Sequence, residues 1–173
     1  MNQAIHMIDL LIHLNGDPAE VFAFAGTMTH DIEVEDTLCA TVKFRNGSFG
    51  TIEVSTSCAP GFPRRLELAG SKGSVAFEEN TLTRWSFIEK LPEDEEIMKL
   101  LAASSDTAGG GSSPGNINKA GHAAQLEDLA EAILTGKKLF LDGHEGRRAV
   151  ELICGIYESA KSGKPYFFKE EEK

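Results

Sequence analysis

The chain has 173 residues, with 17 Lys or Arg against 27 Asp or Glu, so its formal net charge is -10 and a general attraction for nucleic acid is not expected. Its length fits one ordinary domain, and 41% hydrophobic and 25% charged residues are typical of a soluble globular protein. No run approaches the roughly 20 apolar residues of a membrane-spanning helix, so no membrane partner is expected.

The first predicted element is a short helix over residues 4–14. Its apolar residues recur at helical spacing, and Gly16 ends the pattern. This periodicity begins almost at the first residue, so we expect the chain to start inside a longer protein. The apolar positions are Ile5, Ile8, Leu11 and Ile12.

Residues 37–88 are predicted to form a meandering antiparallel sheet, preceded by an apolar run at 21–25. Runs over 37–44 and 48–56 flank Asn46-Gly47, a strong signal for a hairpin. Three further runs alternate apolar with polar residues, as half-buried strands do. They cover 65–69, 74–77 and 81–88. The predicted fold class is α+β, with an open, mainly antiparallel β-sheet and helices packed on one face.

The free face of this sheet is predicted to be the interface of a homodimer or tetramer. Too few helices are expected to cover both faces, and outward positions of the strands include apolar side chains. These are Cys39 or Leu38, Phe49, Ile52 and Val54.

A loop rich in Ser, Gly, Asn and Pro is predicted over residues 102–121, either as a functional loop or as a poorly ordered one. Its triplet Gly109 to Gly111 does not satisfy the Gly-x-Gly-x-x-Gly fingerprint that joins a strand to a helix in dinucleotide-binding domains. No cofactor-binding residue is therefore expected in this chain.

Two amphipathic helices are predicted near the C-terminus, over 120–134 and 144–162. Residues 1–168 are predicted to form one domain, and 169–173 a solvated charged tail. In the first of these helices, one face carries Leu126, Leu129, Ala130 and Ile133.

His6 is the histidine best placed for chemistry, because Asn2 and Asp9 fall near it on one helical face. A structural role for a single histidine near a helix start is the competing interpretation. The acidic residues Glu33, Glu35 and Asp36 suggest either a solvated turn, which is favoured, or a site for a cation or a sugar hydroxyl.

The segment 60–65 is predicted to be a rigid connection between strands. Its Arg64 and Arg65 offer an alternative, since two guanidinium groups could bind an anionic group. A metal site is not expected, because the 5 histidines lack close pairing and the 3 cysteines are far apart. An odd number of separated cysteines fits a cytoplasmic location.

An ordered series of motifs resembles the C-terminal domain of the glucose-fructose oxidoreductase, inositol dehydrogenase and MocA (Gfo/Idh/MocA) family. The likeness extends over nearly the whole chain. The motifs are MNQAIHMIDLL from residue 1, IEVEDT from 32, NGSFGTIEVST from 46, PGFPRRLE from 60, GSKGSV from 70, HAAQLED from 122, DGHEGRRA from 142 and IYESA from 156.

The resemblance implies a two-domain enzyme that transfers hydride between NAD or NADP and a sugar, polyol or related secondary alcohol. It implies that the N-terminal Rossmann domain is absent from this chain, which would therefore bind no cofactor and be inactive alone. The family's Asp-x-x-x-His pair maps onto Asn2 and His6, which makes His6 the catalytic residue although Asn replaces Asp. The substrate-binding residues implied are Asn2, Arg64, Arg65 and His122.

A second interpretation is a non-catalytic sugar-binding or scaffold module that kept the fold. The lack of a Rossmann half favours it, and the presence of His6 with its surroundings argues against it.

Overall fold

The computed structural model describes residues 4–79, 81–105 and 120–169. Contacts within the chain group it into two compact units, residues 1–62 with 141–173 and residues 63–140. Both units contain open antiparallel sheets and helices, which confirms the predicted fold class. The strands form two sheets rather than the one meandering sheet expected, and the single domain over 1–168 stays a prediction.

The first unit contains a four-stranded antiparallel sheet in the order β3-β2-β1-β7, with two helices. The turn at Asn46 and Gly47 joins β2 to β3, and Gly47 has φ +88°, which glycine adopts without strain. The elements are α1 (Ile5–Asn15), β1 (Pro18–Gly26), β2 (Thr37–Phe44), β3 (Phe49–Ser55), α4 (Gly143–Ser162) and β7 (Tyr166–Phe167).

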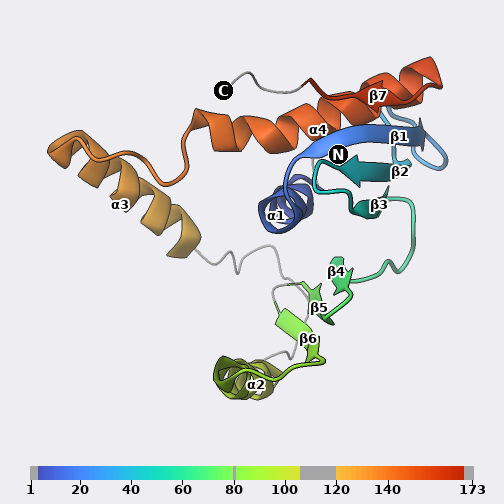
Figure 1. Ribbon diagram of the computed structural model, residues 1–173. Coiled ribbons are helices and arrows are strands. Elements are labelled where there is room, and N and C mark those ends of the chain that lie inside the picture. The colour runs from blue at the N-terminus through green and yellow to red at the C-terminus, as the bar shows by residue number, and fades with distance from the viewer. Residues whose placement is uncertain (1–3, 80, 106–119, 170–173) are drawn as a thin grey trace. The chain divides into compact units, whose positions relative to one another are not determined.

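The core of this unit lies between one face of the sheet and the two helices. Alternate residues of β2 are buried, as a strand with one covered face requires. Ile8 and Ile12 of α1 and Leu152 and Ile156 of α4 belong to the same core cluster as the sheet residues. Figure 1 shows α4 running alongside β1. Both helices therefore cover the same face.

The opposite face of this sheet is uncovered among the described residues and carries aromatic side chains. Phe24 is 65% exposed, Phe49 79% and Phe167 66%. Cys39 pairs with Phe24 in the register and is also exposed, as predicted. The prediction for two β3 residues was wrong, because Ile52 is buried and Val54 packs against the core. The register places both opposite buried residues of β2, so they face inward.

Ser159 is a buried polar residue that joins α4 to β1. Its hydroxyl accepts a hydrogen bond from the backbone N–H of Ala23 at 3.1 Å and donates one to the carbonyl of Lys164 at 2.8 Å. β7 pairs with β1 only at Glu20 and Val21. The Ser159 hydroxyl therefore gives the backbone N–H of Ala23 a hydrogen-bond partner beyond the end of β7. Burial of the hydroxyl is tolerated because both its hydrogen-bonding functions are used.

The second unit contains a three-stranded antiparallel sheet in the order β4-β5-β6 and two helices. One of these helices, α2, was not predicted, although Pro92 at its first position and three acidic residues in its first turn are typical of a helix start. Trp85 of β6 donates to Asp94 of α2 at 2.8 Å. The elements are β4 (Arg65–Gly70), β5 (Gly73–Glu78), β6 (Thr81–Phe87), α2 (Pro92–Ser105) and α3 (Ala120–Thr135).

The loop predicted over 102–121 was wrong at both ends, because residues 102–105 belong to α2 and 120–121 to α3, and residues 106–119 lie outside the described residues. Its glycine triplet lies outside the described residues. On α3, the predicted apolar face carries Leu126, Leu129 and Ile133, all exposed. Within the described ranges, no helix is long and apolar enough to cross a membrane.

Candidate functional site

His6 lies in the first turn of α1 and is exposed. Ile8 and Ile12 on the same helix are buried, so the His6 side chain belongs to the outer side of the helix. Asp9 is exposed as well, and Asn2 lies outside the described residues. The placement leaves the imidazole accessible to a ligand, and its catalytic role stays a prediction.

Arg64 and Arg65 already have carboxylate partners within the second unit. The Arg64 side chain donates to Glu79 through Nε at 2.9 Å and Nη2 at 2.6 Å, and its backbone N–H donates to the other carboxylate oxygen at 2.9 Å. These contacts, led by the backbone one, lower the pKa of Glu79. Arg65 pairs with Glu67 on the same strand. Because all four side chains are accessible to solvent, both guanidinium groups are open to competition from an anionic ligand.

His122, the remaining predicted substrate-binding residue, is exposed in the first turn of α3. It belongs to the second unit with Arg64 and Arg65, whereas His6 belongs to the first. Substrate binding by these residues stays a prediction.

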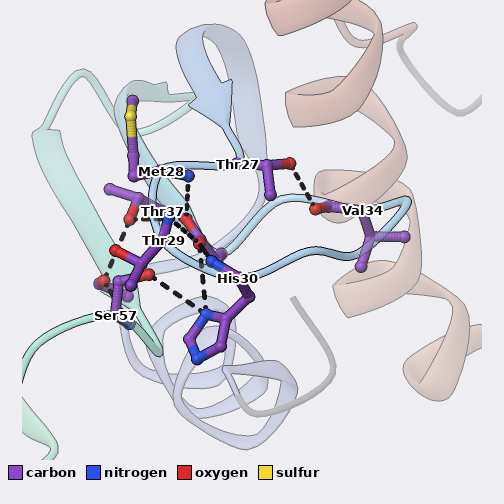
Figure 2. A network of polar contacts seen from close by, with 9 residues as sticks. Thr27, Met28, Thr29, His30, Val34, Thr37 and Ser57 are labelled. Carbon is purple, nitrogen blue, oxygen red and sulfur yellow. Dashed lines mark hydrogen bonds and ion pairs between the residues drawn. The ribbon is translucent and has the colours of Figure 1, made fainter.

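A polar network around Asp36 was not predicted from the sequence. Figure 2 shows Met28, Thr29 and His30 of the loop between β1 and β2 close to Thr37 and Ser57. Asp36 is 3% exposed and accepts from the backbone N–H groups of Met28 at 2.8 Å, Thr29 at 2.8 Å and His30 at 2.9 Å. The hydroxyl of Thr37 donates to it at 3.1 Å. The solvated turn that the sequence favours is wrong for Asp36, because this residue is buried.

The network stabilises Asp36 in its charged form. Its hydrogen bonds hold the pKa of Asp36 well below its usual range, and the backbone N–H of His30 is the largest cause. The backbone N–H groups of Thr29 and Met28 and the Ser57 side chain act in the same direction, whereas burial opposes them. A buried carboxylate is tolerated here because several donors replace its water. The local turn pattern of Asp residues gave no cue, since the donors lie six to eight residues before Asp36 rather than two residues after it.

The same loop is attached to α4 through Glu35. The Tyr157 hydroxyl donates to the Glu35 carboxylate at 2.9 Å. Burial and this contact raise the pKa of Tyr157 to about 12. Glu33, the third acidic residue of the predicted cluster, is exposed. The three acidic side chains therefore have different surroundings and do not form one binding site.

The described residues contain no group of three His, Cys, Asp or Glu side chains arranged to hold a metal ion. They also offer no glycine-rich turn between a strand and a helix N-terminus that would fit the pyrophosphate of a dinucleotide. The chemistry available in this part of the chain is therefore that of exposed histidines, carboxylates and guanidinium groups.

Comparison with known proteins relates the N-terminal part of the chain to a described family. Residues 1–76 match the family described as GFO/IDH/MocA C-terminal domain. The chain is 24% identical over 180 residues to the uncharacterized oxidoreductase YrbE of Bacillus subtilis strain 168, an alignment that covers 100% of this chain and 49% of YrbE. The resemblance noted in the sequence is confirmed.

Solved structures share the fold over almost the whole chain. The WlbA dehydrogenase of Bordetella pertussis, in complex with NADH and UDP-GlcNAcA, has a TM-score of 0.81 and 28% identity over 99% of this chain and 48% of its own. The WlbA dehydrogenase of Chromobacterium violaceum, in complex with the same two molecules, has a TM-score of 0.79 and 30% identity over 99% and 46%. The chain thus spans about half the length of the relatives it matches.

Proposed function

From the match of residues 1–76 to the GFO/IDH/MocA C-terminal domain, we propose that the chain is the substrate-binding and oligomerising half of an NAD(P)-dependent oxidoreductase. The substrate is a sugar, polyol or related secondary alcohol. One observation carries the proposal: 99% of the chain shares its fold, at 28% identity, with a dehydrogenase in complex with NADH and a UDP-linked sugar. UDP-GlcNAcA is accordingly the first substrate to test.

The other half of the protein holds NAD or NADP in this proposal, since no residue described here fits a dinucleotide. The cofactor, when bound there, supplies a nicotinamide C4 that exchanges hydride with the alcohol carbon. The exposed imidazole of His6 binds the reacting hydroxyl and takes or relays its proton. Asn2, Arg64, Arg65 and His122 contribute polar groups that bind the rest of the substrate, and the arginines suit its anionic groups.

The catalytic role is tested by replacing His6 with Ala in the complete enzyme, in which a nicotinamide-binding half precedes this chain. Loss of general acid-base assistance should lower kcat by roughly 10²- to 10⁴-fold and leave cofactor affinity nearly unchanged. His13, exposed on the same helix, provides the matched control, and His13→Ala should keep kcat within about twofold.

Melting temperatures of the same preparations separate catalysis from stability. If His6 only supports the helix, His6→Ala will melt earlier and keep its kcat per folded molecule. A complete protein that binds UDP-GlcNAcA but never reduces NAD or NADP would favour the sugar-binding or scaffold interpretation.

The uncovered face of the β3-β2-β1-β7 sheet forms the interface between copies of the chain in this proposal. Its exposed aromatic side chains, Phe24, Phe49 and Phe167, give a second subunit apolar area to bury. Light scattering at micromolar concentration should give at least twice 18.7 kDa. Phe49→Lys should shift the protein toward monomers, whereas a monomeric parent protein would contradict the assignment.

A further inference from the structure

His30 extends from the β1–β2 loop and contacts the buried carboxylate of Asp36. Its Nδ1 lies 3.2 Å from Oδ2 of Asp36 and 3.5 Å from the Ser57 hydroxyl (Figure 2). The His30 side chain is 46% exposed, whereas that of Asp36 is 0% exposed. The imidazole therefore contacts the protein through Nδ1 and is partly exposed to solvent.

The loop has other means of holding its shape. Three backbone N–H groups donate to Asp36, and the Thr27 hydroxyl donates to the Val34 carbonyl at 2.7 Å. The Asp36 N–H donates to the Gly26 carbonyl at 3.1 Å, which closes the base of the loop. The imidazole adds one contact to a segment that these hydrogen bonds already close.

Asp36 determines which nitrogen of the neutral imidazole carries the proton. Its carboxylate is charged and accepts hydrogen bonds only, so the neutral imidazole contacts it through a protonated Nδ1. The lone pair is then on Nε2, at the far side of the ring. A buried carboxylate that orients an imidazole in this way prepares the other nitrogen to accept a proton or a hydrogen bond.

The position of the loop in the first unit supports a role at a ligand. The last residue of α1 is attached to the β2–β3 turn, since Asn15 donates to Ser48 at 2.8 Å and Asn46 donates to the Asn15 carbonyl at 2.7 Å. The first turn of α1, with His6, leads away from that turn. The loop carrying His30 joins the other ends of β1 and β2. His6 and His30 therefore both lie in segments distant from the β2–β3 turn.

The geometry points to His30 as a second histidine of the substrate site, with Nε2 accepting a hydrogen bond from a sugar hydroxyl and Asp36 positioning the ring through Nδ1. This inference rests on the proposed function. The Ser57 hydroxyl lies near the same nitrogen, at the longer distance of 3.5 Å.

The tautomer is tested on the present chain by NMR of the ¹⁵N-labelled imidazole at a pH where His30 is neutral. The expected result is a proton on Nδ1 and an unprotonated Nε2. A predominant Nε2–H form would overturn the inference, whatever the activity of the complete enzyme.

The role toward substrate is tested by steady-state kinetics of the complete enzyme with UDP-GlcNAcA. His30→Phe should raise KM for the sugar about tenfold, the effect of one lost hydrogen bond, and leave KM for the cofactor unchanged. His30→Gln, whose carbonyl oxygen can accept a hydrogen bond, should recover part of the loss. His13→Phe is the control for adding an apolar ring to the surface.

The outcomes distinguish this inference from the proposed function. Full turnover with an unchanged sugar KM in His30→Phe would refute the role of His30 and leave the dehydrogenase assignment intact. A lower melting temperature without a change in KM would assign His30 to loop stability alone. A wild-type enzyme without activity on any sugar or polyol would refute both.

Discussion

Replacing Gly155 by Ala should destabilise the protein, although this substitution usually strengthens a helix. Gly155 lies within α4, where that helix packs against the C-terminal segment. A Cβ added at this position would lie 2.5 Å from Cζ of Phe168 and 2.8 Å from Cδ1 of Tyr166. The Phe168 ring belongs to the core, so it has little room to move.

The expected magnitude follows from two opposing effects. Alanine is favoured over glycine within a helix by roughly 0.5–1 kcal/mol. Forcing a methyl group into a packed core costs about 1–3 kcal/mol. Gly146, exposed on the same helix with nothing within 4 Å of its added Cβ, experiences only the first effect. The difference between the two alanine variants therefore isolates the packing cost, about 1–3 kcal/mol.

Denaturant unfolding of the wild type and both variants measures these free energies. Gly146→Ala should unfold at higher denaturant concentration than the wild type, and Gly155→Ala at lower. If Gly155→Ala is as stable as Gly146→Ala, the close approach of α4 to Phe168 does not exist in solution, and the reasoning fails.

Two further predictions concern buried polar groups. Ser159→Ala removes the acceptor of a buried backbone N–H and should lower the free energy of unfolding in urea by about 1–3 kcal/mol. Ser162 is exposed on the same helix, so Ser162→Ala should change that free energy by no more than about 0.5 kcal/mol. Equal losses in the two variants would contradict the buried role of Ser159. Because the pKa of Asp36 is lower in the folded state than its unfolded value of about 3.9, its stabilising contribution is complete above that pH and is lost as the pH falls further. Unfolding free energies measured from pH 5 to pH 2 should decline less steeply in Asp36→Asn than in the wild type, and parallel curves would contradict this.

Most helices and strands were predictable because their signals are local. The β2–β3 hairpin follows from Asn46-Gly47 between two alternating runs, and the strand over 37–44 was predicted with the observed bounds. Helix α4 follows from its apolar periodicity and from Gly163, which has φ 65° at its end. Helix α2 was missed because its sequence is mostly acidic at the start and its apolar face is weak.

The orientation of β3 required the pairing register. Apolar residues occur on both faces of this strand, with Phe49 outward and Ile52 and Val54 inward. Periodicity alone does not say which set faces the core, because a shift of one residue exchanges the two faces. Strand β7 was missed for a related reason, since a two-residue strand exists only through its pairing with β1.

Of the candidate site, the sequence by itself determined the resemblance to the GFO/IDH/MocA C-terminal domain, the exposed position of His6 on an amphipathic helix and the absence of a glycine fingerprint for a dinucleotide. These depend on residue order and spacing over a few turns. Only the tertiary structure decided that Asp36 is buried, that it contacts His30, and that Ser159 accepts a hydrogen bond from Ala23 of β1. Each depends on groups brought together by chain closure, from 6 residues apart for His30 and Asp36 to 136 for Ala23 and Ser159. The burial of a residue depends on the residues that pack around it, and the periodicity of its own segment does not identify those residues.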